Sequence, residues 1–194
     1  MTIISSHPRT ALAVVLVLVA TATACAGPEG PAGPAGPPGP GSGGVILETV
    51  YGTAPLVVDS SALGYAALPG LSSTVTVPAG ATYRVLIETD GGVQLNSADP
   101  TASGFADVAV FIDGAQVGSG RRVPVSNNAI VLYSVASYGF SIETTLPAGA
   151  HNVVVMAKRF PVTLHDFYVS SAASGSGLPG NPRLQGVLNI IAFP

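Results

Sequence analysis

Few residues of this chain have types and spacings that suit catalysis. His165 and Asp166 are adjacent and serine is plentiful, so a Ser-His-Asp hydrolase site is the first chemistry to consider. The sequence contains no Gly-x-Ser-x-Gly nucleophile elbow. The pair also lies in the strand-like segment 163–169, where neighbouring side chains point to opposite faces of a sheet. We therefore predict that the protein is not an enzyme.

Other polar residues could bind a ligand. His151 follows a turn sequence and begins a strand, and we interpret it as a packed or hydrogen-bonded residue rather than a metal ligand. Oxygen ligands of the kind that calcium takes occur in a Gly-rich segment, at Asp90, Asn96, Asp99 and Asp107. Their spacing matches no calcium-binding loop, and we interpret them as solubilising loop side chains. No cofactor and no metal site is predicted.

Composition excludes several classes of protein. Charged residues make up 9% of the 194 residues, and 7 Lys and Arg against 10 Asp and Glu give a net charge of −3. A nucleic-acid-binding protein would be basic, and a helix-rich protein would contain far more Lys and Glu. One cysteine permits neither a disulfide nor a Cys-based zinc site within the chain. We expect no nucleic-acid partner.

The single cysteine, Cys25, stands where an apolar segment ends. Residues 10–24 carry no charge, and this length is short of the about 20 residues that span a membrane. We predict that residues 1–24 are an export signal. The run Ala22-Thr23-Ala24-Cys25 resembles a bacterial lipoprotein signal, which implies that the Cys25 thiol is acylated and anchors the chain to a membrane. An ordinary cleaved signal and an uncleaved anchor are the alternatives.

Residues 25–44 form a segment rich in glycine and proline. Glycine occupies every third position and proline follows each of them, at Gly27, Gly30, Gly33, Gly36 and Gly39. This register is typical of the collagen triple helix, because only glycine fits where three chains meet on the axis. A stiff monomeric polyproline spacer is the alternative, and both are extended. We predict a stalk that lifts the next domain off a lipid surface.

Residues 45–194 have the patterns of β-strands. Segment 73–77 alternates, and Asp113-Gly114 is a two-residue hairpin signal between apolar runs. No window of eleven residues has a helical apolar period free of Gly and Pro. About ten strands without helices predict an all-β sandwich, jelly roll or barrel. The expected strands are 45–51, 56–59, 73–77, 83–89, 106–112, 115–117, 129–134, 140–146, 152–159, 163–169 and 184–193.

Two glycine-containing sequences are interpreted as chain reversals or loops. Pro-Ala-Gly-Ala occurs at 78–81 and again at 147–150, each time between strand-like segments. Proline presets one turn residue and glycine can adopt positive φ, so we interpret both copies as turns that join separate strands. Arg121 and Arg122 follow Gly-Ser-Gly, and we interpret them as part of a solvated loop.

Taken together, residues 45–194 resemble the jelly-roll domains of the C1q and tumour-necrosis-factor type. The resemblance is carried by Pro-Ala-Gly before the strand 83–87, by Asp113-Gly114, by the segment 146–151 and by the final segment 182–193. It implies a ten-stranded jelly roll that forms trimers. A collagen-like tract joined to such a head is also the domain order of C1q-like proteins.

The last expected strand is apolar on both faces, whereas a strand with one wet face alternates. We expect one face to fill the core and the other to be covered by a trimer contact. One face carries Val187, Asn189, Ile191 and Phe193, and the other carries Leu188, Ile190 and Ala192. The candidate core or interface residues are Val187, Ile190, Ile191 and Phe193.

The function expected from these features is that of a non-enzymatic protein of the bacterial cell surface. It would be exported, anchored in a membrane through Cys25, and built as a stalk that presents a trimeric head for adhesion or surface structure. A lectin-like head that binds a carbohydrate or peptide in its distal loops is the alternative. A hydrolase on the same scaffold is a third and weaker reading.

Overall fold

The computed structural model describes residues 45–59, 64–128, 130–131, 133–160, 165–170 and 184–194. All of them belong to the unit Ser42–Pro194. The predicted signal, Cys25 and the stalk glycines Gly27, Gly30, Gly33, Gly36 and Gly39 lie outside the described residues. Within the ranges given, no helix is long and apolar enough to cross a membrane.

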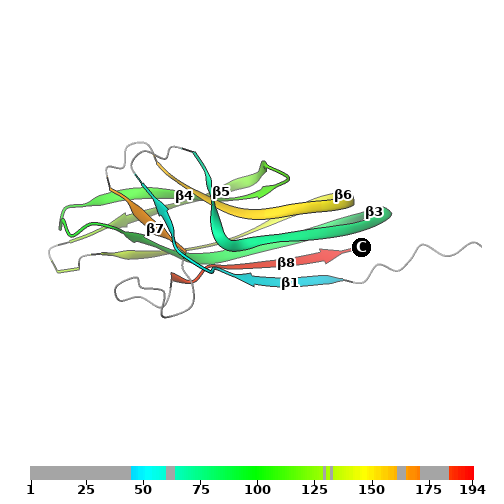
Figure 1. The fold of residues 1–194 in the computed structure, drawn as a ribbon, viewed down its shortest axis with the longest axis horizontal. Helices are drawn as coiled ribbons and strands as arrows, with labels where there is room; N and C mark the ends of the chain where they lie inside the picture. Colours follow the sequence, from blue (N-terminus) through cyan, green and yellow to red (C-terminus); the bar gives the residue numbers. More distant parts are fainter. Residues whose placement is uncertain (1–44, 60–63, 129, 132, 161–164, 171–183) are drawn as a thin grey trace, which may run out of the picture. The chain divides into compact units, whose positions relative to one another are not determined.

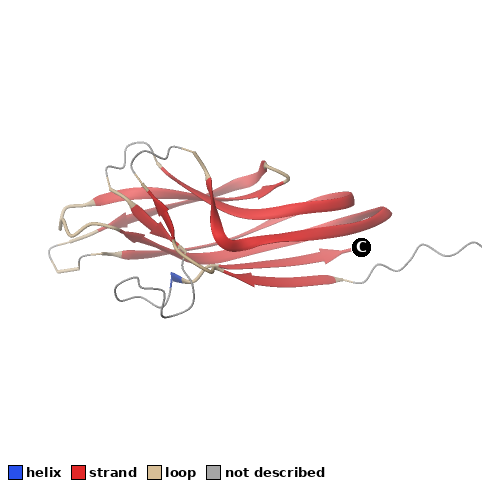
Figure 2. Ribbon diagram, in the orientation of Figure 1, coloured by secondary structure: helices blue, strands red, loops and turns tan. Residues whose placement is uncertain are grey.

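The described residues form eight β-strands and no α-helix, which confirms the all-β prediction (Figures 1 and 2). The short blue piece in Figure 2 is a single 3₁₀ residue, Leu184. The strands are β1 (Ile46–Tyr51), β2 (Leu56–Val58), β3 (Ala66–Leu95), β4 (Ser103–Ile112), β5 (Ala115–Ser126), β6 (Val135–Arg159), β7 (Phe167–Val169) and β8 (Val187–Phe193).

The strands pair in a nested order, and every pair is antiparallel. The first strand pairs with the last, β1 with β8; inside that pair β2 pairs with β7, β3 with β6, and β4 with β5. Further pairs join β3 to β8, β3 to β7 and β4 to β6. The described strands therefore form one long antiparallel ribbon. Strands from different parts of this ribbon also hydrogen-bond to each other, as β3 does to β8 and β4 does to β6.

Both copies of Pro-Ala-Gly-Ala lie inside long strands, so the prediction that they separate strands is wrong. Val77 of β3 lies opposite Gly149 of β6, and the next pair along is Thr82 with Pro147. Residues 78–81 thus oppose a single residue of β6. Gly80 and Gly149 have positive φ, 77° and 140°, as a turn requires. The two strands bend together and keep pairing on both sides of the bend (Figure 1).

The bend divides the strands into two groups. The first group holds β1, β2, β7, β8, residues 82–95 of β3 and residues 135–147 of β6. The second holds residues 66–77 of β3, residues 149–159 of β6, β4 and β5. One hydrophobic cluster contains buried residues of both groups, and this is consistent with a β-sandwich. Its members include Val85, Ile87, Leu188 and Ile190 from the first group and Val75, Val108, Val153 and Val155 from the second.

The hairpin predicted at Asp113-Gly114 is confirmed. Ile112 lies opposite Ala115, which leaves a two-residue loop. Asp113 and Gly114 have φ values of 52° and 83°, and both are therefore in the left-handed region that a type I′ turn needs. This turn places the Asp113 carboxylate beside β6.

The strand predicted at 129–134 is wrong, since the described residues of that segment are outside any strand. The side-chain oxygen of Asn128 accepts hydrogen bonds from the backbone N–H groups of Ile130 and Val131, at 2.9 and 2.7 Å. Such local bonds compete with a sheet ladder. Tyr133 has a φ of 55°, which a strand does not adopt.

Candidate functional site: the outer face of the first strand group

The last strand separates a buried face from a partly exposed one. Leu188, Ile190 and Ala192 are buried, so Ile190 is a core residue. Val187, Ile191 and Phe193 lie on the opposite side and are partly exposed. We call this side of β1, β8 and the adjoining halves of β3 and β6 the outer face. Its apolar members are Leu47, Tyr51, Leu86, Val187, Ile191 and Phe193.

The strand register sets these side chains in rows across four strands. Ile191 pairs with Leu47 on one side and with Leu86 on the other, and Leu86 pairs in turn with Glu143. Apolar groups therefore sit side by side rather than singly. Leu47 is 73% exposed and Tyr51 is 55% exposed, which is unusual for large apolar side chains gathered on one sheet face.

A polar row crosses the outer face beside these apolar residues. Asn189 pairs with Thr49 and with Glu88, and the Thr49 hydroxyl donates a 2.8 Å hydrogen bond to the Asn189 side-chain oxygen. Two depressions of about 310 and 260 Å³ adjoin along this row, because Glu88 and Asn189 line both. Asp90 and Ser141 line the first, and Leu47 lines the second. The row gives an apolar surface a few directional polar groups.

One end of the outer face carries an exposed ion pair. Arg84 Nε lies 3.3 Å from Glu143 Oε1, and the side chains are 65% and 61% exposed. The Arg84 guanidinium also lies over the Phe193 ring, 5.5 Å from its centroid. An exposed pair of this kind adds about 0–1 kcal/mol to stability. The two side chains neutralise each other's charge beside the apolar rows.

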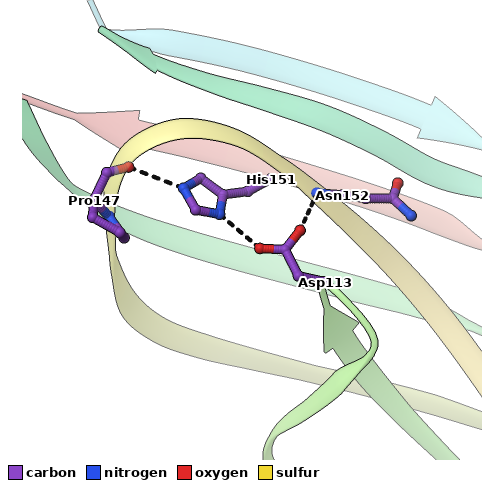
Figure 3. Close-up of polar contacts among 4 residues, drawn as sticks. All are labelled: Asp113, Pro147, His151 and Asn152. Carbon is purple, nitrogen blue, oxygen red and sulfur yellow. Dashed lines mark hydrogen bonds and ion pairs between the residues drawn. The ribbon is translucent and has the colours of Figure 1, made fainter. Parts of the chain in front are cut away.

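His151 is hydrogen-bonded at both ring nitrogens, which confirms its interpretation as a hydrogen-bonded residue (Figure 3). Nδ1 lies 2.8 Å from Asp113 Oδ2, and Nε2 lies 2.9 Å from the Pro147 carbonyl oxygen. The other carboxylate oxygen of Asp113 accepts the backbone N–H of Asn152 at 2.8 Å. With both nitrogens occupied, His151 has no free lone pair for a proton transfer or a metal.

The same contacts shift two pKa values. The hydrogen bond to Asp113, with a smaller contribution from the Pro147 carbonyl, raises the pKa of His151 above its ordinary value. The hydrogen bond from His151, followed by that from the Asn152 backbone, lowers the pKa of Asp113. Both shifts favour the charged forms, an imidazolium beside a carboxylate.

The pair considered for hydrolysis, His165 and Asp166, precedes β7 and is not in a strand. The strand predicted over 163–169 is therefore limited to β7 among the described residues of that segment, and residues 163–164 lie outside them. The Asp166 carbonyl accepts the N–H of Asn96 at 2.9 Å. His165 contributes to lowering the pKa of Asp99, after the larger effect of hydrogen bonds from Thr101.

The oxygen ligands considered for calcium are distributed over different elements. Asp90 is in β3, Asp107 is in β4, and Asp99 accepts hydrogen bonds from the backbone and hydroxyl of Thr101 at 2.8 and 2.7 Å. In the part of the chain that the structure describes, no group of three or more His, Cys, Asp or Glu residues could hold a metal ion.

The loop predicted at Arg121 and Arg122 is wrong, because both residues are in β5. Arg122 makes two hydrogen bonds to the Asp107 carboxylate, at 2.7 and 3.0 Å, and its guanidinium stacks on the Phe160 ring at 3.7 Å from the centroid. This cross-strand pair holds β5 against β4. Sequence reasoning missed it, although Asp107 and Arg122 lie on either side of the predicted hairpin.

Comparison with known proteins adds no family assignment. No protein-family model matches the chain, and no curated protein matches it significantly. The likeness to C1q- and TNF-type domains thus remains a resemblance, carried by the residues named above.

Proposed function

We propose that this is a lipid-anchored, non-enzymatic protein of the bacterial cell surface, in which a collagen-like stalk presents a trimeric jelly-roll head of the C1q/TNF type. The proposed role is adhesion or surface structure. Three independent features support it: the strand pairing, the outer face, and the sequence of residues 1–44.

The strand pairing supports the jelly roll. A jelly roll is a long antiparallel ribbon that is folded over, so that its first strand pairs with its last and each inner strand with its counterpart. The pairs β1 with β8, β2 with β7, β3 with β6, and β4 with β5 have this nesting. The joint bend at Gly80 and Gly149 lets the ribbon fold over on itself.

The apolar outer face carries the proposal that the head assembles with copies of itself. Leu47, Tyr51 and Ile191 present apolar surface that a soluble head would otherwise expose to water. The polar row through Asn189 and Glu88 supplies the few specific contacts that fix the orientation of an interface.

The position of β1 indicates which partner covers this face. β1 begins at Ile46, directly after the proposed stalk, and Leu47 is its most exposed apolar residue. A stalk of three chains would bring three copies of β1 together, and closed threefold symmetry would then bury the same face on each copy. A second and a third copy of this chain are therefore the proposed occupants.

The proposal is tested by two matched aspartate substitutions in the full-length protein, with chemical cross-linking as the measurement. Ile191→Asp places a charge on the outer face and is expected to abolish the cross-linked trimer, because an unpaired buried charge is costly. Thr76→Asp places the same charge at an exposed strand position of the second group and is expected to leave the trimer intact. Equal cross-linking of both variants would refute the proposed interface.

A further inference from the structure

We propose that His151 and Asp113 form a proton-dependent latch that fastens the β4–β5 turn to the bend of β6. The latch belongs to the fold of the head, and it stands whether or not the outer face binds a second copy. It joins two places that the sequence separates by 38 residues. Figure 3 shows the four residues that make it.

The turn side of the latch is anchored without the histidine. Asp113 donates its backbone N–H to the Asn152 carbonyl at 3.0 Å and accepts the Asn152 N–H on its carboxylate at 2.8 Å. These two bonds fix the carboxylate beside β6. The second carboxylate oxygen is then free to face Nδ1 of His151, at 2.8 Å.

The bend side of the latch depends on the histidine. His151 Nε2 lies 2.9 Å from the carbonyl oxygen of Pro147, the residue at which β6 bends. The imidazole therefore bridges the bend and the hairpin turn. A carbonyl and a carboxylate only accept, so the doubly protonated ring, in which both nitrogens donate, is the form that satisfies both contacts.

Loss of one proton breaks this bridge. An imidazolium has two N–H groups and satisfies both acceptors, but a neutral imidazole has one N–H and one lone pair. One of the two contacts would then place a lone pair against an acceptor oxygen. The His151 side chain is 12% exposed and the imidazole itself meets little water, whereas the Asp113 side chain is 51% exposed and its carboxylate can be solvated.

The surroundings of His151 leave Asp113 as its charged partner. Among the described residues, Asp113 is the group whose charge acts on His151. The β3 residues opposite this part of β6 are Thr74, Val75 and Thr76, and none of them titrates in the neutral range. The latch therefore responds to the protonation of His151 itself.

The pH range of the latch follows from the direction of the pKa shift. The pKa of His151 is raised above 6.5, chiefly by the hydrogen bond to Asp113. A raised pKa means that the imidazolium contributes fully below pH 6.5 and that its contribution is lost as the pH rises through the raised value. The latch is closed in mildly acidic solution and opens in alkaline solution.

Amide hydrogen exchange on the full-length protein tests the latch, with rates corrected for the intrinsic effect of pH. We expect the protection of the amides of residues 148–152 to fall about fivefold between acidic and alkaline pH, the factor that corresponds to one hydrogen bond. His151→Gln is expected to abolish this fall, because glutamine does not titrate. His165→Gln is the matched control and should retain the fall of the wild type.

The latch is refuted if wild-type protection at residues 148–152 does not change with pH, or if His151→Gln shows the same fall. A second measurement does not depend on a folded variant. Nitrogen NMR of the wild-type imidazole should show both His151 nitrogens protonated in mild acid and a pKa above 6.5. A pKa at or below 6.5 would overturn the proposal.

Discussion

Nδ1 of His151 lies 2.8 Å from Oδ2 of Asp113, which joins the bend of β6 to the turn between β4 and β5. The contact depends on two sequence features that are local in themselves. Asp113-Gly114 makes a tight turn that aims a carboxylate at β6, and Pro147-Ala-Gly bends β6 so that His151 faces that carboxylate. Two unrelated turns therefore create one charged pair.

The first prediction concerns the thermal stability of the head as a function of pH. The pKa of His151 is raised, so the contacts of the imidazolium stabilise the fold below pH 6.5. This stabilisation is lost as the pH rises through the raised pKa. The lowered pKa of Asp113 stabilises the fold above pH 3.8, and this stabilisation is lost as the pH falls through that pKa. The wild-type Tm should exceed that of His151→Gln most between pH 3.8 and 6.5. A constant difference across pH would contradict the assignment.

The second prediction concerns Gly70, whose φ is +84°. A Cβ at this position would lie 2.5 Å from the Tyr51 carbonyl oxygen and 2.7 Å from the Thr53 nitrogen, which are backbone atoms that cannot move aside. Gly80 has a similar φ of +77°, but nothing lies within 4 Å of its Cβ position. Gly80→Ala should cost about 1–2 kcal/mol, the backbone strain alone.

Gly70→Ala should lower the free energy of unfolding by about 1–3 kcal/mol more than Gly80→Ala, because steric overlap adds to the strain. Urea unfolding of both variants measures the difference. Equal urea midpoints for the two variants would contradict this prediction, because they would show that the backbone around Tyr51 moves to make room for the added Cβ.

The third prediction compares two arginines in ion pairs. Arg122→Lys removes a two-point contact with Asp107 and the stacking on Phe160, and should lower the free energy of unfolding by more than Arg84→Lys does. Arg84→Lys affects a more exposed pair, that with Glu143, and should change the free energy of unfolding by less than about 0.5 kcal/mol. Denaturant unfolding measures both, and the reverse order would show that the Arg122 pair contributes little.

The overall fold class could be predicted from the sequence because it depends on local patterns. Alternation in segment 73–77 and the Asp113-Gly114 turn each specify their structure within a few residues. The two faces of β8 could likewise be separated, since Leu188, Ile190 and Ala192 share one side. The sequence does not show which side of β8 is turned toward the core, because that depends on the pairing of β8 with the distant strands β1 and β3.

The errors arose where pairing between distant strands overrides local signals. Pro-Ala-Gly-Ala has the composition of a turn, but β3 and β6 remain hydrogen-bonded on both sides of it. The Asp107–Arg122 pair was hidden by a register shift. Gly118 and Gly120, both at φ +65°, shift the hairpin register between Val108 and Val110, so that counting outward from the turn misplaces Arg122.

The fourth prediction concerns attachment to the membrane. Cys25→Ala should move the protein from the membrane fraction to the soluble or secreted fraction, because the proposed acyl chains are the anchor. Raising the salt concentration should not release the wild type, since the attachment is not electrostatic. Fractionation with detergent-phase partitioning measures both effects. An unchanged distribution of Cys25→Ala would remove the lipid anchor from the account.

The central claim is that the outer face of the head binds copies of itself to form a trimer. Residues 45–194 contain every described core residue and lack the signal and the stalk, so they are the fragment in which to measure assembly. Light scattering at micromolar concentration should give three times the mass of one fragment, and Ile191→Asp should reduce this to a single copy. A wild-type mass equal to one fragment would contradict the claim, because the outer face would then not bind copies of itself.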